Sequence, residues 1–209
     1  GTFHSICLRI LRREAEYLPF DAQFVIYDDA DQQTLLKRIL KSMGLRDKEY
    51  HPRAVSSLIS KCKNQLMTPE DWAKETTTEW EEAAARVYAE YQRLLVEANA
   101  LDFDDLIVKT VELFEECPDV LNYYHNKYRY IMVDEYQDTN HAQYKLISLL
   151  SSIHHNLCVV GDDDQSIYRF RGATIENILN FEDENENAKT IRLEQNYRST
   201  GNILNAANE

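Results

Sequence analysis

Two adjacent carboxylates, Asp134 and Glu135, follow the apolar run 130–133 and are the residues of this sequence best suited to chemistry. If the run is a buried strand, one carboxylate can hold Mg²⁺, directly or through water. The next can orient and deprotonate a water molecule that attacks a terminal phosphate. Acids that only face solvent, or that cap a helix starting near Asn140, would give the same pattern. The pair alone is compatible with both interpretations.

A second polar segment follows the apolar run 157–160 and contains Gln165, whose side-chain amide can both donate to and accept from a phosphate. Beyond it, aromatic and basic residues alternate: Tyr168, Arg169, Phe170 and Arg171. Aromatic faces stack on bases without sequence preference, and guanidinium groups pair with phosphates. The alternative is a loop with two aromatic side chains packed into the core. Because the alternation is flanked by glycines, we favour binding of single-stranded nucleic acid.

Tyr197 and Arg198 follow a third apolar run, 190–193. An arginine at a strand end can stabilise negative charge in the transition state of phosphoryl transfer, and a neighbouring tyrosine can stack on a purine. This dipeptide is weak evidence by itself. Three such segments at three expected strand ends are stronger evidence for a nucleotide site.

The elements that would position these residues change in character after Ala100. From there on, short runs rich in β-branched residues alternate with helical segments, which predicts a parallel sheet of the α/β class. Ligands of such sheets bind at the carboxyl ends of the strands. All three polar segments would therefore meet at one edge of the sheet.

The first half of the chain has helical spacing of its apolar residues. We expect helices over 2–15, over 28–43 with Gly44 as the stop, over 52–66, and over 79–98, with another helix starting at Pro69. Residues 16–100 are accordingly predicted to be entirely α-helical. Basic residues on two of these helices form a face that could meet DNA phosphates: Lys37, Arg38, Lys41, Arg53, Lys61 and Lys63.

Composition supports a folded, helix-rich protein. The 209 residues are 44% hydrophobic and contain only five glycines and four prolines. The net charge of −13 disfavours nucleic acid as a partner, but residues 1–65 hold 11 of the 23 basic and only 8 of the 36 acidic residues. The four cysteines are scattered without zinc-ligand spacing. With no apolar run long enough to span a membrane, we expect a cytoplasmic protein.

Five segments carry a resemblance to a known family: TFHS at 2–5, LDFDDL at 101–106, VDEYQDTN at 133–140, VVGDDDQSIYRFRGA at 159–173 and LEQNYRS at 193–199. These segments, in this order along the whole chain, resemble the signature motifs of superfamily 1 DNA helicases of the UvrD/Rep/PcrA group. The resemblance implies a partial RecA-like (P-loop NTPase) parallel-sheet domain with an all-helical insertion. Residues 1–15 and 101–209 would belong to motor domain 1A, and residues 16–100 to the insertion, 1B.

The same resemblance implies roles for individual residues, with Mg²⁺ and ATP as cofactors. Asp134 would hold Mg²⁺, Glu135 would be the catalytic carboxylate, and Gln165 would sense the γ-phosphate. Arg198 would act as the arginine finger, and Tyr197 would stack on adenine. Single-stranded DNA would be contacted by Thr2, His4, Tyr168, Phe170 and Arg171. Many relatives carry Trp at the position of Phe170, and the smaller ring of Phe should stack with some loss.

The function implied is ATP-dependent 3′-to-5′ translocation on single-stranded DNA and unwinding of duplex DNA in repair or replication. A helicase subunit of a helicase-nuclease would carry the same motifs. A different class, a metal-dependent phosphoesterase, would use the carboxylates of Asp134, Glu135, Asp138, Asp162, Asp163 and Asp164 to bind two metals. A non-enzymatic interaction module is the remaining alternative.

One part of the family pattern does not occur in this sequence. None of the five glycines is followed by Lys, so there is no GxxxxGKS or GxxxxGKT phosphate-binding loop. The family places that loop before TFHS. Because its backbone N–H groups and its Lys supply most of the attraction for the triphosphate, we expect this chain on its own to be inactive and to hold ATP poorly.

Overall fold

The computed structural model describes residues 1–46, 48–162, 165, 176–185, 187–193, 195 and 199–207. The helices are α1 (Phe3–Arg13), α2 (Asp29–Ser42), α3 (Pro52–Asn64), α4 (Pro69–Glu75), α5 (Glu79–Glu97), α6 (Phe103–Glu116), α7 (Pro118–Lys127), α8 (His141–Ser151), α9 (Glu176–Leu179), α10 (Phe181–Glu184) and α11 (Gly201–Ala207), with 3₁₀ turns η1 (Ala15–Tyr17) and η2 (Tyr136–Asp138). The strands are β1 (Val25–Tyr27), β2 (Ala100–Asp102), β3 (Ile131–Val133) and β4 (Leu157–Val159). The described residues thus form a helix-rich α/β protein.

The strands form two separate parallel pairs. β3 pairs with β4 in a register that sets Ile131 opposite Leu157 and Val133 opposite Val159. This confirms the first two apolar runs as neighbouring parallel strands. The third run, 190–193, was predicted to be a strand, and that prediction is wrong: no strand is assigned there. Ile191 and Leu193 are 72% and 87% exposed, and none of the strands in the described part of the chain pairs with this run.

The second pair corrects the expectation that residues 16–100 are entirely helical. β1 lies within that range and pairs with β2, with Val25 opposite Ala100 and Tyr27 opposite Asp102. The Asn99 side chain accepts a hydrogen bond of 3.0 Å from the Asp21 N–H and donates one of 2.7 Å to the Asp21 carboxylate, which holds the approaches to the two strands together. A three-residue strand is too short to show a period in sequence, and its partner is far along the chain.

The predicted helices are confirmed, and side chains cap them locally. Capping boxes start α2 with Asp28, α5 with Thr78 and α8 with Asn140. In each, the cap side chain accepts a hydrogen bond from the backbone N–H three residues on. Gly44 follows α2 with a φ of 68°, a left-handed conformation that glycine adopts without a steric penalty.

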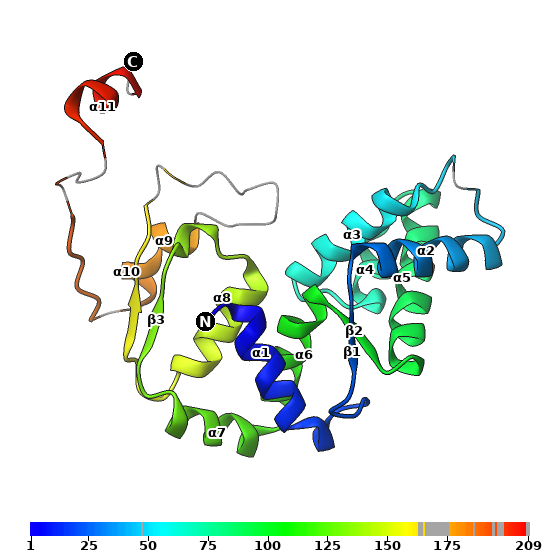
Figure 1. Ribbon diagram of the computed structural model, residues 1–209, viewed down its shortest axis with the longest axis horizontal. Coiled ribbons are helices and arrows are strands. Elements are labelled where there is room, and N and C mark those ends of the chain that lie inside the picture. Colours follow the sequence, from blue (N-terminus) through cyan, green and yellow to red (C-terminus); the bar gives the residue numbers. More distant parts are fainter. Residues whose placement is uncertain are drawn as a thin grey trace.

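The helices pack around two main hydrophobic cores. One lies among α1, α6, α7 and α8, and the other among α2, α3 and α5. Figure 1 shows α2 to α5 grouped on one side, β3 with α9 and α10 on the other, and α1 and α6 between them. α6 contacts α1, α3, α7 and α8 and so links the two groups, and α3 also contacts α8 directly.

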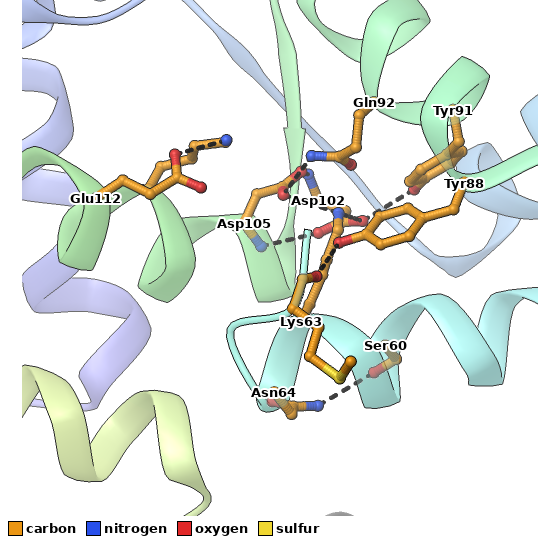
Figure 2. Close-up of polar contacts among 11 residues, drawn as sticks. Ser60, Lys63, Asn64, Tyr88, Tyr91, Gln92, Asp102, Asp105 and Glu112 are labelled. Carbon is orange, nitrogen blue, oxygen red and sulfur yellow. Dashed lines mark hydrogen bonds and ion pairs between the residues drawn. The ribbon is translucent and has the colours of Figure 1, made fainter. Parts of the chain in front are cut away.

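A buried ion cluster joins the two groups where α6 begins. The ammonium of Lys63 on α3 lies 2.6 Å from an Asp102 oxygen and 2.8 Å from an Asp105 oxygen. Tyr91 donates a hydrogen bond to Asp102, and Gln92 donates to Asp105, both from α5. Figure 2 shows these side chains converging from α3, α5 and the β2–α6 junction. The Lys63 side chain is 1% exposed, so its predicted place on the DNA-facing basic surface is wrong.

The cation and the two carboxylates of the cluster shift one another's pKa values. Burial alone would lower the pKa of Lys63, but the two neighbouring carboxylates outweigh it and raise that pKa. Burial, followed by the charge of Asp105, raises the pKa of Asp102 to about 6. The two carboxylates therefore favour the charged form of the buried Lys63 side chain.

We predict that Lys63→Met lowers the free energy of unfolding by about 3–5 kcal/mol, because it leaves two buried carboxylates without their cation. Urea unfolding of this chain measures the change. The control is Lys74→Met, which removes an exposed pair with Asp71 and should change stability by less than about 0.5 kcal/mol. Equal, small effects of the two substitutions would contradict the stabilising role of the buried cluster.

Candidate functional site

The site begins where β3 ends, at Asp134 and Glu135. Both side chains are exposed, and the Asp134 carboxylate accepts a hydrogen bond of 3.0 Å from the Glu135 N–H. Glu135 has a φ of 52° and a ψ of 42°, in the left-handed region that a residue with a side chain rarely occupies. Such strain costs about 1–3 kcal/mol and occurs preferentially at functional sites. The chain turns sharply here into η2.

Gln137, inside η2, is the side chain that links the two strand ends. It is fully buried, at 0% exposure. Its Nε2 donates to a Glu135 carboxylate oxygen at 2.7 Å, and its Oε1 accepts from the Asp162 N–H at 3.1 Å. Both ends of the amide are thereby used, as a buried amide requires.

The segment after β4 completes this edge of the sheet. The Gln165 Nε2 donates to the Asp162 carboxylate at 2.6 Å. Gly161 allows the segment to approach η2 closely, because a Cβ at this position would lie 2.6 Å from Ile178 and 2.7 Å from the Gln137 Oε1. The structure thus brings Asp134, Glu135 and Gln165 to one edge, where the sequence predicted them.

Thr2 and His4 lie at the start of α1. The Thr2 hydroxyl caps this helix by accepting a hydrogen bond of 3.2 Å from the Ser5 N–H. The ring of His4 contacts the ring of Phe103 edge-on, with centroids 6.1 Å apart. Burial lowers the pKa of His4, although Asp104 opposes the shift. At neutral pH, His4 therefore offers an uncharged ring.

Sequence reasoning assigned no role to Gln137, Gly161 or Phe103. All three lie inside the motif segments, but the sequence does not show which residues surround them in the fold. Phe103 is 51% exposed at the first position of α6, which leaves much of its ring face open beside His4. The one local signal is that this aromatic residue directly follows the capping Asp102 at the start of a helix.

Five of the predicted site residues lie outside the described residues. These are Tyr168, Phe170, Arg171, Tyr197 and Arg198. Their assignments as DNA-binding, adenine-stacking and arginine-finger residues stay predictions.

The carboxylates at the strand ends suit a weakly held, hydrated metal ion. Within the described part of the chain, no group of three or more His, Cys, Asp or Glu side chains is placed to hold a metal. Asp163 and Asp164 lie outside it, and the two-metal phosphoesterase alternative gains no support. Mg²⁺ commonly binds through one or two carboxylates together with waters and substrate phosphates, and the exposed carboxylate of Asp134 suits this kind of binding.

Asp138 lies in the same turn as Glu135. Burial, followed by the charge of Glu135, raises the pKa of Asp138.

The helices of the described residues include none that is both long and apolar enough to cross a membrane. The four cysteines carry free thiols, and burial raises the pKa of Cys7 and of Cys62 to about 11.

Comparison with known proteins gives a consistent result. Residues 1–186 match the family described as the UvrD/REP helicase N-terminal domain. The whole chain is 56% identical to the ATP-dependent DNA helicase PcrA of Staphylococcus epidermidis and 55% identical to the ATP-dependent DNA helicase PcrA of Staphylococcus aureus. In both cases the match covers 100% of this chain and 29% of the relative, so the chain spans less than a third of the length of these curated relatives.

Proposed function

Because the chain belongs to the UvrD/REP helicase N-terminal domain family, we propose that it forms part of the ATP-driven motor of a DNA helicase. The full-length protein would translocate 3′ to 5′ on single-stranded DNA and unwind duplexes in repair or replication. β3 and β4 would belong to the RecA-like sheet of domain 1A, and residues 16–100 to insertion 1B. The free thiols fit a cytoplasmic location.

One observation carries the proposal: the carboxylate of Glu135 and the amide of Gln165 lie at the ends of adjacent parallel strands and are linked through Gln137 and Asp162. Phosphoryl transfer needs a group that orients the attacking water and a polar group near the γ-phosphate. Glu135 would take the first role and Gln165 the second.

Asp134 would hold the Mg²⁺ that accompanies ATP. The ion would neutralise phosphate charge, while this chain contributes an exposed carboxylate oriented by the Glu135 N–H. Arg198 and Tyr197 are proposed to stabilise transition-state charge and to stack on the adenine base.

The DNA partner would be contacted at two places. Thr2, His4 and Phe103 form a small polar and aromatic surface for single-stranded DNA, to which Tyr168, Phe170 and Arg171 would add. Duplex DNA would meet the basic side chains of α2 and α3 that are exposed: Lys37, Arg38, Lys41, Arg53 and Lys61. Lys63 is excluded from this surface by its burial.

We predict that Glu135→Gln in the full-length protein lowers the kcat of ATP hydrolysis by about 100-fold or more while ATP binding persists. The amide keeps the size and hydrogen bonding of the side chain but cannot accept a proton from water. Steady-state hydrolysis and equilibrium nucleotide binding measure the two effects. Glu116→Gln, an exposed acid at the end of α6, is the control. Wild-type turnover in Glu135→Gln would remove this residue from the site.

Phe103→Ala is expected to weaken binding of single-stranded DNA by about 1–3 kcal/mol, the value of one stacked base. Fluorescence anisotropy with a labelled oligothymidine measures the change in the full-length protein. Tyr130→Ala removes an aromatic ring that is also exposed but precedes β3, and it should leave affinity unchanged. If Phe103→Ala and the wild type bind single-stranded DNA with equal affinity, Phe103 does not contact the DNA.

Reversing two charges on α2, with Lys37→Glu and Lys41→Glu together, should lower duplex affinity and reduce the slope of log K against log salt by about 2. The double reversal Lys127→Glu and Lys145→Glu makes the same charge change on α7 and α8 and serves as the control. If both double variants keep the wild-type salt slope, α2 does not contact duplex phosphates.

A further inference from the structure

Four residues form a continuous hydrogen-bonded connection between the two strand ends. The Glu135 carboxylate accepts from the Gln137 amide, which accepts from the Asp162 N–H, and the Asp162 carboxylate accepts from the Gln165 amide. The three contacts measure 2.7, 3.1 and 2.6 Å. All three distances are short enough for hydrogen bonds, so a shift of one residue changes the position of its hydrogen-bonded neighbour.

Gln137 is the rigid part of this connection. Its side chain is buried completely, and its planar amide is fixed at both ends. Among the hydrogen bonds of the described residues, its Nε2 is the one side-chain donor to the exposed Glu135 carboxylate. Packing and two hydrogen bonds together leave Gln137 few alternative rotamers. The direction of the Glu135 carboxylate therefore depends on where the segment after β4 holds the Asp162 N–H.

We propose that Gln137 is a positioning residue that couples the orientation of the Glu135 carboxylate to the position of Gln165. The proposal rests on the proposed function, in which Glu135 orients the attacking water and Gln165 contacts the γ-phosphate. When Gln165 engages a phosphate, the Asp162 segment is held in place. Gln137 then holds Glu135 in the direction that turnover needs. Loss of the phosphate contact releases the segment, and Glu135 loses its fixed direction.

A substitution at Gly161 provides an independent way to disturb the contact between Gln137 and the Asp162 N–H. A Cβ at this position would lie 2.7 Å from the Gln137 Oε1 and 2.6 Å from Ile178, which is closer than such contacts occur. Gly161→Ala must therefore move Gln137 or the Asp162 segment, although it changes none of the four hydrogen-bonding side chains. Its effect on turnover should resemble that of altering Gln137 itself.

The test is a double-mutant cycle in the full-length protein with saturating single-stranded DNA. Gln137→Met keeps the length of the side chain and removes both of its hydrogen bonds. Gln165→Ala removes the amide that bonds the Asp162 carboxylate. We expect each single variant to lower kcat by about 10- to 100-fold, with KM for ATP changed by less than about threefold. The double variant should fall no more than about threefold below the slower single variant, because both disturb one unit.

Two further measurements separate positioning from a general loss of structure. Gly161→Ala should lower kcat in the same range, while every variant that is assayed melts cooperatively above the assay temperature and keeps the wild-type affinity for an oligothymidine. Gln92→Met removes another amide that bonds an Asp side chain, on α5, and should leave kcat unchanged. If Gln137→Met does not fold, the cycle is carried out with Gly161→Ala in its place.

The outcomes are distinguishable from those that bear on the proposed function. Wild-type kcat in Gln137→Met and in Gly161→Ala, with turnover lost in Glu135→Gln, would overturn the positioning role alone. Effects of Gln137→Met and Gln165→Ala that multiply in the double variant would overturn it as well. Wild-type turnover in Glu135→Gln would overturn both the positioning role and the catalytic site on which it rests.

Discussion

The buried contact of Lys63 with Asp102 and Asp105 is the constraint on which the arrangement of the helices depends. An ammonium group taken out of water costs several kcal/mol unless its partners are within contact distance. α3, α5 and the start of α6 must therefore come together for any of them to be buried. The two carboxylates also form the capping box of α6, so the contact fixes where that helix begins. α6 then packs against α1 and α8, and the two cores are joined.

The strand-end site is placed by the same packing. α8 follows η2 directly, and its cap residue Asn140 donates a hydrogen bond of 2.6 Å to Asn64 at the end of α3. α9 contacts η2 from the other side, where Asn177 donates to the hydroxyl and the carbonyl oxygen of Thr139. The turn that carries Glu135 is thus held between helices that belong to different parts of the chain. A left-handed residue persists only where its surroundings fix it in this way.

This arrangement explains how a strained residue can be kept at an exposed position. The backbone of η2 is fixed to β4 by the bond from the Tyr136 N–H to the Val160 carbonyl, at 2.9 Å, and by Gln137. Hydrogen bonds to buried groups are costly to break, because the freed groups find no water. The turn therefore keeps a left-handed residue in place while the carboxylate of Glu135 remains open to solvent.

The sequence alone predicted the helices between residues 2 and 98, the strands β3 and β4, the strand-end positions of Asp134, Glu135 and Gln165, and the family. Those features depend on residues within a few positions of one another, such as capping pairs, apolar periodicity and contiguous motifs. Only the tertiary structure decided that β1 pairs with β2, that the run 190–193 forms no strand, that Lys63 is buried and that Gln137 links the strand ends. Lys63 meets Asp102 across 39 residues and Gln137 meets Asp162 across 25. Contacts over such separations depend on how whole elements pack, and no local pattern in the chain records them.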